Sequence, residues 1–204
     1  MKKYLFCLLL VMTFFSAFAQ KEPFEGYILY RYNYFDLEGN DISAKMLLEN
    51  DSVQHYYINK SNYISYKQNQ TLEQLYNSKT NKYYYARDSK IYVLDAGSAQ
   101  SPKPKYKKPD EKKTILGHKC TAIQEISDTN SVINYISDDI WVDPAPYQNH
   151  KLGNWGEFLK ESKGRLGLQI TSYHEDYYVT MTAVLIQNLV LPAEAFDIDK
   201  LLKK

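Results

Sequence analysis

The sequence predicts a mainly β protein, a single domain formed by one antiparallel, strongly curved sheet or half-barrel of about 10–12 strands with one short helix. Three observations lead to this prediction. Tyrosine, which favours strands, makes up 20 of the 204 residues. Short segments in which apolar and polar residues alternate recur along the chain. The loops between them are short as well, and strands joined by short loops run antiparallel because a parallel crossover needs a longer connection.

The first strand is expected over residues 25–35. One face carries large apolar side chains at alternate positions, namely Ile28, Tyr30, Tyr32 and Tyr34. Turn-forming residues follow at 36–40. Further short strands are expected at 44–49, 52–58, 62–67, 73–77, 82–87 and 91–94. These segments predict that the first half of the chain is a meander.

Residues 96–113 interrupt this rhythm. Proline and lysine alternate there, at Pro102, Pro104 and Pro109 and at Lys103, Lys105, Lys107, Lys108, Lys112 and Lys113. Because a central strand tolerates neither proline nor repeated charge, the segment is predicted to be an exposed Lys/Pro loop. The neighbouring Asp110 and Glu111 favour a solvated connection over a surface that binds anionic lipid or polymer.

Strands are expected again at 121–125, 132–137 and 139–142, where Trp141 is a core or rim anchor. Residues 154–163 are the helix candidate, since Asn154 can cap its start and Gly164 can end it. Trp155, Phe158 and Leu159 would share one face of that helix.

The last strands, 166–173 and 177–189, are predicted to form a hairpin around His174-Glu175-Asp176. Residues 197–204 form a short polar tail that can make one helical turn.

Residues 1–19 have the features of a secretory signal peptide. Lys2 and Lys3 precede an apolar run at 5–15, and Ala17 and Ala19 suit the peptidase. A membrane anchor is the alternative, but a spanning helix needs about 20 mainly apolar residues and this run is shorter. We therefore expect the mature chain to be residues 20–204, a single soluble β-rich domain without a transmembrane segment.

The charge of that mature chain is close to neutral. Cleavage lowers the number of lysines and arginines from 25 to 23, against 24 acidic residues. Nucleic-acid-binding proteins usually have a clear positive excess, so we expect no nucleic-acid partner. Cys120 is the one cysteine left, which excludes an intramolecular disulfide in the mature form. We expect it to be buried under a strand; a reactive thiol or an intermolecular link are the alternatives.

No catalytic or metal signature is found in the sequence. It has no G-x-S-x-G motif. Asp138 and Asp139 are adjacent, and neighbours on a strand point to opposite faces. The histidines are scattered and form no zinc motif; they are His55, His118, His150 and His174. His174, at the expected hairpin tip, is interpreted as part of a solvated turn. We therefore predict no catalytic residues, no metal and no cofactor, and leave the ligand-binding residues unassigned.

Three segments resemble a known group of proteins. They are Phe24-Glu-Gly-Tyr-Ile-Leu-Tyr30, Lys113-Thr-Ile-Leu-Gly-His-Lys-Cys120 and Ile140-Trp-Val-Asp-Pro144. Similar segments occur in small secreted bacterial proteins of unknown function, including the GLPGLI family. The resemblance implies a LolA/LolB-like half-barrel that can shelter acyl chains, and export to the periplasm or outer surface of a Gram-negative bacterium. It supplies no catalytic residues.

The leading functional hypothesis is an exported, non-catalytic envelope protein that binds a lipid or other apolar ligand in its curved sheet. One alternative is a protein-protein interaction or surface-structural protein, whose tyrosine-rich faces contact another envelope protein. The other is a hydrolase with an unfamiliar site near His174 or His118.

Overall fold

The computed structural model describes residues 22–88, 90–98, 103–128 and 130–201. The predicted signal peptide, residues 1–19, lies outside the described residues. In the described part of the chain, no helix is both long and apolar enough to cross a membrane.

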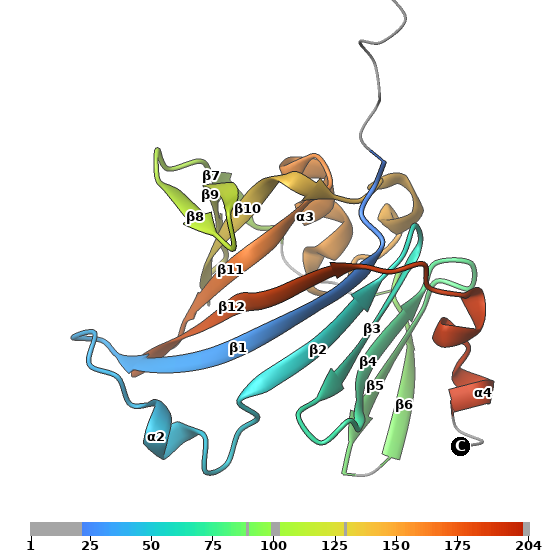
Figure 1. Ribbon diagram of the computed structural model, residues 1–204, viewed down its shortest axis with the longest axis horizontal. Helices are drawn as coiled ribbons and strands as arrows, with labels where there is room; N and C mark the ends of the chain where they lie inside the picture. The colour runs from blue at the N-terminus through green and yellow to red at the C-terminus, as the bar shows by residue number, and fades with distance from the viewer. Residues whose placement is uncertain (1–21, 89, 99–102, 129, 202–204) are drawn as a thin grey trace, which may run out of the picture.

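The protein is built on one antiparallel sheet of twelve strands, which is open rather than closed into a barrel (Figure 1). The strands are β1 (Gly26–Asp36), β2 (Val53–Ile58), β3 (Asn62–Lys67), β4 (Leu72–Asn77), β5 (Lys82–Arg87), β6 (Lys90–Asp95), β7 (Lys105–Lys107), β8 (Lys112–Ile115), β9 (His118–Ile126), β10 (Ser131–Trp141), β11 (Arg165–Tyr173) and β12 (Tyr177–Asn188). The predicted fold class, a mainly β antiparallel sheet, is confirmed.

The sheet joins two meanders. Its strand order is β6-β5-β4-β3-β2-β1-β12-β11-β10-β9-β7, and β8 also pairs with β9. The first meander contains β1 to β6, the second contains β9 to β12, and β1 pairs with β12 along its whole length. This central pair brings the two ends of the chain together, so neither meander forms a complete unit alone.

Short helices lie on both faces of the sheet (Figure 1). The predicted helix is α3 (Trp155–Ser162), preceded by the 3-10 turns η1 (Ala145–Tyr147) and η2 (Leu152–Asn154). The sheet bends around α3, and we call the face that α3 covers the inner face. On the outer face, η3 (Ala193–Phe196) contacts β3 and β4 and leads into α4 (Ile198–Leu201).

Each face has its own hydrophobic core. The main core lies between α3 and the inner face, where Leu159 packs among residues such as Ile28 and Leu168. The smaller core consists of Ile64, Leu75 and Phe196 on the outer face. The neighbouring β3 residues Tyr63 and Ile64 therefore pack in different cores, as the alternation of side chains along a strand requires.

The segment 44–49, predicted to be a strand, is instead the helix α2 (Ser43–Met46) followed by turns. The Asp41 carboxylate accepts a hydrogen bond from the Ser43 backbone, and the Ser43 hydroxyl accepts one from the Tyr34 backbone. These side-chain bonds to the backbone start a helical turn and compete with strand pairing. Leu48, which lies within the predicted strand, is 84% exposed.

The Lys/Pro segment 96–113 also differs from the predicted exposed loop. The segment contains the short strand β7 and the first two residues of β8, and both strands pair with β9. Ala96 is fully buried because its carbonyl accepts hydrogen bonds from the backbones of Lys151 and Leu152. Lys105 and Lys107 are exposed, while Tyr106 between them packs against the main core.

Candidate functional site

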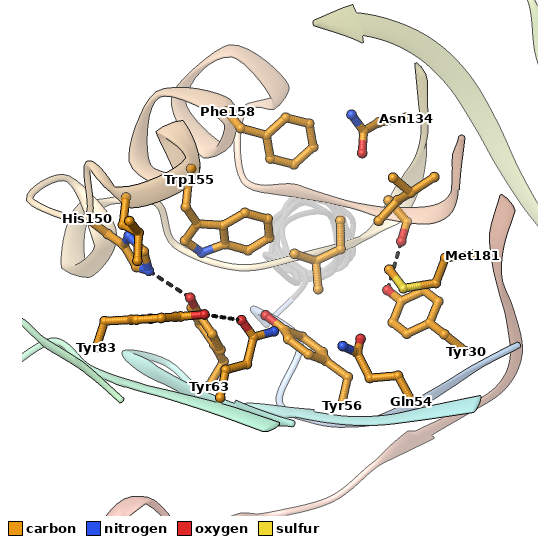
Figure 2. A pocket seen from close by; sticks show the side chains of 16 residues that line it. Tyr30, Gln54, Tyr56, Tyr63, Tyr83, Asn134, His150, Trp155, Phe158 and Met181 are labelled. Atoms are coloured by element: carbon orange, nitrogen blue, oxygen red, sulfur yellow. Dashed lines mark hydrogen bonds between the residues drawn. The ribbon is translucent and has the colours of Figure 1, made fainter. Parts of the chain in front are cut away.

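A cavity of about 290 Å³ lies between α3 and the inner face of the sheet, and we call it the inner chamber (Figure 2). Strands β1 to β5 supply Tyr30, Gln54, Tyr56, Tyr63, Gln74 and Tyr83. The opposite side, which includes α3 and η2, supplies His150, Leu152, Gly153, Trp155 and Phe158. Strands β10 to β12 complete the wall with Asn134, Leu166, Gly167, Ile170 and Met181. Among the described residues, no lysine, arginine, aspartate or glutamate lines this chamber.

Local sequence patterns place these side chains on the chamber. Alternation along β2 turns Gln54 and Tyr56 inward. Trp155 and Phe158 stand three residues apart on α3, so they share a helical face, and their rings stack with centroids 5.5 Å apart. The helix candidate and its apolar face were predicted correctly.

His150 is held in a buried aromatic cluster beside the chamber. Its Nε2 shares a hydrogen bond of 2.7 Å with the Tyr63 hydroxyl, and the Tyr76 ring lies 4.2 Å away between centroids. Burial lowers the pKa of His150 to about 4, so the imidazole is neutral at neutral pH. The inner chamber is therefore uncharged as well as aromatic.

Most polar atoms around the chamber have a partner within the protein. The Tyr30 hydroxyl donates to the Gly167 carbonyl at 2.8 Å, and the Tyr83 hydroxyl donates to the Gln74 side chain at 2.8 Å. The Tyr56 hydroxyl, the Trp155 indole Nε1 and the His150 Nδ1 differ, because all three are buried without a hydrogen-bond partner among the described residues. Figure 2 shows Trp155 on the α3 side and Tyr56 on the sheet side of the same space. Three residues that line the chamber thus have unused hydrogen-bonding capacity.

A second cavity of about 560 Å³ adjoins the first, and we call it the outer chamber. Five residues line both cavities: Asn134, Gly153, Trp155, Phe158 and Ile170. The outer chamber is more polar, since Glu125, Ser127, Asp128, Asn130 and Asn154 also line it. The shared lining shows that the two cavities adjoin at these residues.

Asn154 does not cap α3 as predicted. Its φ is 57°, in the left-handed region, and its side chain makes no capping hydrogen bond. The side chain bonds to Glu125 of β9 instead. The tertiary contact replaces the local cap, which sequence alone could not reveal.

The adjacent carboxylates Asp138 and Asp139 have separate partners, in agreement with the prediction that they point apart. Asp138 pairs with Arg165 at 2.9 Å, and Asp139 contacts Nδ1 of His118 at 2.8 Å. Cys120 is 1% exposed, as predicted for a buried small side chain. Burial is the main cause that raises the pKa of its thiol to about 11, so the thiol is protonated.

The other histidines lie apart. His55 hydrogen-bonds Tyr27 and Gln70, and exposed His174 stacks on Tyr177 at the predicted hairpin tip. Within the described residues, no group of three or more His, Cys, Asp or Glu side chains is placed to hold a metal ion.

No family model and no curated protein matches the sequence. The fold is similar to two solved structures of PNGF-II. The first, in a C2 space group, has a TM-score of 0.49 at 12% identity, and covers 84% of this chain and 29% of that chain. The second, in a P21 space group, has a TM-score of 0.48 at 12% identity, and covers 84% of this chain and 30% of that chain. This chain thus spans less than a third of the length of those chains.

Few features of the sequence indicate the chamber. Tyr30 and the α3 residues Trp155 and Phe158 were placed on apolar faces, but nothing indicated that they meet. His150 follows a proline-rich stretch with no recognisable motif, and Gln54 and Asn134 lie in ordinary strands. A polar residue at an inward strand position was the one available signal for the two amides.

Proposed function

We propose that this protein is an exported, non-catalytic binding protein that holds a small amphipathic ligand in its inner chamber. The observation that carries the proposal is the chamber itself: an uncharged, aromatic cavity whose lining residues include three buried polar atoms with no partner among the described residues. Ligand sites are typically preformed apolar cavities with a few placed polar groups.

The polar atoms define what the ligand must offer. The Trp155 indole is a donor without acceptor capacity, so the ligand needs a hydrogen-bond acceptor near it. The surrounding rings and aliphatic side chains require the rest of the ligand to be apolar. A lipid-like or other apolar molecule with one or more oxygen atoms meets both requirements.

Export remains part of this proposal. It is supported by the sequence of residues 1–19 and by the resemblance to secreted GLPGLI-type proteins. The non-catalytic role is supported by the separate engagement of Asp138 and Asp139 and by the protonated, buried thiol of Cys120.

Native mass spectrometry of protein purified from its own envelope tests the proposal. We expect a co-purified small molecule that is lost in the Ile170→Trp variant, because Ile170 lines both chambers and tryptophan would fill them. Leu72→Trp is the matched control, since Leu72 packs in the outer-face core and lines neither chamber. A wild-type protein that is empty and takes up no amphipathic probe would refute the proposal.

A second candidate function is docking of another protein on β6. This strand lies at one end of the sheet and exposes Tyr92, Val93 and Leu94, of which Val93 is 51% exposed. Exposed apolar edges favour strand addition by a partner. Pull-down from envelope extract with wild type and Val93→Lys tests it; a monomeric protein that captures the same material in both forms would contradict docking there.

A further inference from the structure

The outer chamber contains a carboxylate that no cation of the described residues neutralises. Glu125 is partly buried on β9, and desolvation raises its pKa above the ordinary value. Its side-chain hydrogen bond comes from Asn154, which is neutral. In the part of the chain that the structure describes, no lysine or arginine lines either chamber.

The nearest charged groups on the neighbouring elements do not change this picture. Asp128, at the end of β9, lines the same chamber and adds a second negative charge. Tyr106 of β7 lies opposite Glu125 in the sheet. The α3 carboxylates Glu157 and Glu161 pair with Lys103 and Lys108 at 3.8 Å each. Lys105 and Lys107, which flank Tyr106 on β7, are exposed and do not line the outer chamber. Alternation along the strand turns their side chains to the face opposite Tyr106.

An anionic ligand would be disfavoured by this arrangement. A fatty acid with its alkyl chain in the inner chamber would place its carboxylate beside the partly buried Glu125 and the exposed Asp128, and like charges repel most strongly where solvent is partly excluded, as at Glu125. A cationic group would have the opposite effect, because it would place a positive charge beside the partly desolvated Glu125 carboxylate.

We propose that the ligand is an amphipathic amine, whose apolar body and an acceptor oxygen occupy the inner chamber while its ammonium group pairs with Glu125 in the outer chamber. This inference rests on the proposed binding function and specifies the chemistry of its ligand. The acceptor oxygen would accept hydrogen bonds from the unpartnered Trp155 Nε1 and Tyr56 hydroxyl. The ammonium would form an ion pair with the Glu125 carboxylate. The five residues shared by the two chambers would surround the apolar middle of the molecule.

Four probes of matched length test each end of the ligand separately. They are 8-amino-1-octanol, octane-1,8-diol, 8-hydroxyoctanoate and octylamine, titrated by isothermal calorimetry at pH 7.5 and moderate ionic strength. We expect 8-amino-1-octanol to bind about tenfold more tightly than the diol, because one partly buried charge pair is gained. The hydroxyoctanoate should bind more weakly than the diol, and octylamine more weakly than 8-amino-1-octanol.

The Glu125→Gln variant keeps the shape of the side chain and removes its charge. It should abolish the tenfold preference for the amine and leave the affinity for the diol within about twofold of wild type. Glu175→Gln is the matched control, because Glu175 lies exposed in the β11–β12 turn, far along the sequence from β9 and outside the linings of both chambers. Circular dichroism verifies that both variants are folded.

The outcomes separate the two proposals. If the diol binds but the amine has no advantage, or if Glu125→Gln retains the advantage, the inference about the amine is wrong and the binding function stands. If none of the four probes binds wild type, both are wrong.

Discussion

Removing one hydroxyl group from each of two buried tyrosines should change the stability of this protein in opposite directions. Tyr30 and Tyr56 both line the inner chamber and are 4% and 8% exposed. The Tyr30 hydroxyl donates to the Gly167 carbonyl at 2.8 Å, whereas the Tyr56 hydroxyl has no partner among the described residues. The substitution to phenylalanine is therefore the same chemical change in two different hydrogen-bonding states.

The expected magnitudes follow from those states. Tyr30→Phe removes a hydrogen bond and leaves the Gly167 carbonyl without that donor, so it should lower the free energy of unfolding by about 2 kcal/mol. Tyr56→Phe removes a buried hydroxyl that gains nothing in the unliganded protein. It should raise the free energy of unfolding by about 1 kcal/mol, because an unpaired buried hydroxyl is destabilising.

Urea unfolding followed by circular dichroism measures both changes, with the slope of free energy against urea used to check that the transition is unaltered. The two variants should differ by about 3 kcal/mol. Binding should change in the opposite sense at Tyr56, since Tyr56→Phe loses a polar group that the ligand would use. If Tyr56→Phe destabilises the protein as much as Tyr30→Phe, the Tyr56 hydroxyl has a partner and the polar anchor of the chamber is lost.

Three other predictions concern the scaffold. Gly164→Ala should lower the free energy of unfolding by at least about 3 kcal/mol, because φ is +78° and a Cβ would overlap the Val142 carbonyl oxygen. Gly117→Ala, at φ +84° with no described atom within 4 Å, should lower it by about 1 kcal/mol. Equal losses in the two variants would contradict the steric argument. Cys120 should resist iodoacetamide at pH 8 in the native protein and react fully in urea, since it is buried with a thiol pKa of about 11; fast native labelling would show that the site opens. His150 should make stability fall with acidity between pH 6.5 and pH 4, by roughly 3 kcal/mol, because the unfolded chain binds a proton at its ordinary pKa of 6.5 while the folded protein does not until about 4. Urea midpoints of wild type and His150→Gln, measured across this pH range, test the prediction. If stability depends on pH equally in both proteins, His150 is not the source of the dependence.

The strands that sequence predicted best are those with local partners. The expected bounds of β3 and β5 match the structure, and β4 and β6 are each within two residues of it. These strands pair with neighbours across turns of a few residues, so the pattern of each hairpin contains the information that forms it. The prediction at 44–49 was wrong because Asp41 and Ser43 form hydrogen bonds that a hydropathy pattern does not register.

The candidate site depends on pairings that are distant in sequence. Tyr30 reaches Gly167 across 137 residues, and Tyr63 reaches His150 across 87. Those contacts follow from the pairing of β1 with β12 and from the bend of the sheet around α3, neither of which periodicity can specify. The individual faces were predictable, whereas their meeting at one chamber was not.

The tyrosine content has a physical role in keeping the chamber open. Tyr56, Tyr63 and Tyr76 form a row on the inner face, with successive ring centroids 5.6 and 5.7 Å apart. Flat rings packed in a row have few rotamers open to them, whereas leucine or methionine side chains at these positions could turn into an empty space and fill it. Two of the hydroxyl groups also hold the row to fixed partners, because Tyr63 hydrogen-bonds His150 and Tyr76 donates to the Asn81 side chain. In the binding function proposed above, a cavity bounded in this way would exist before a ligand arrives, so little of the binding free energy would be spent on rearranging the sheet.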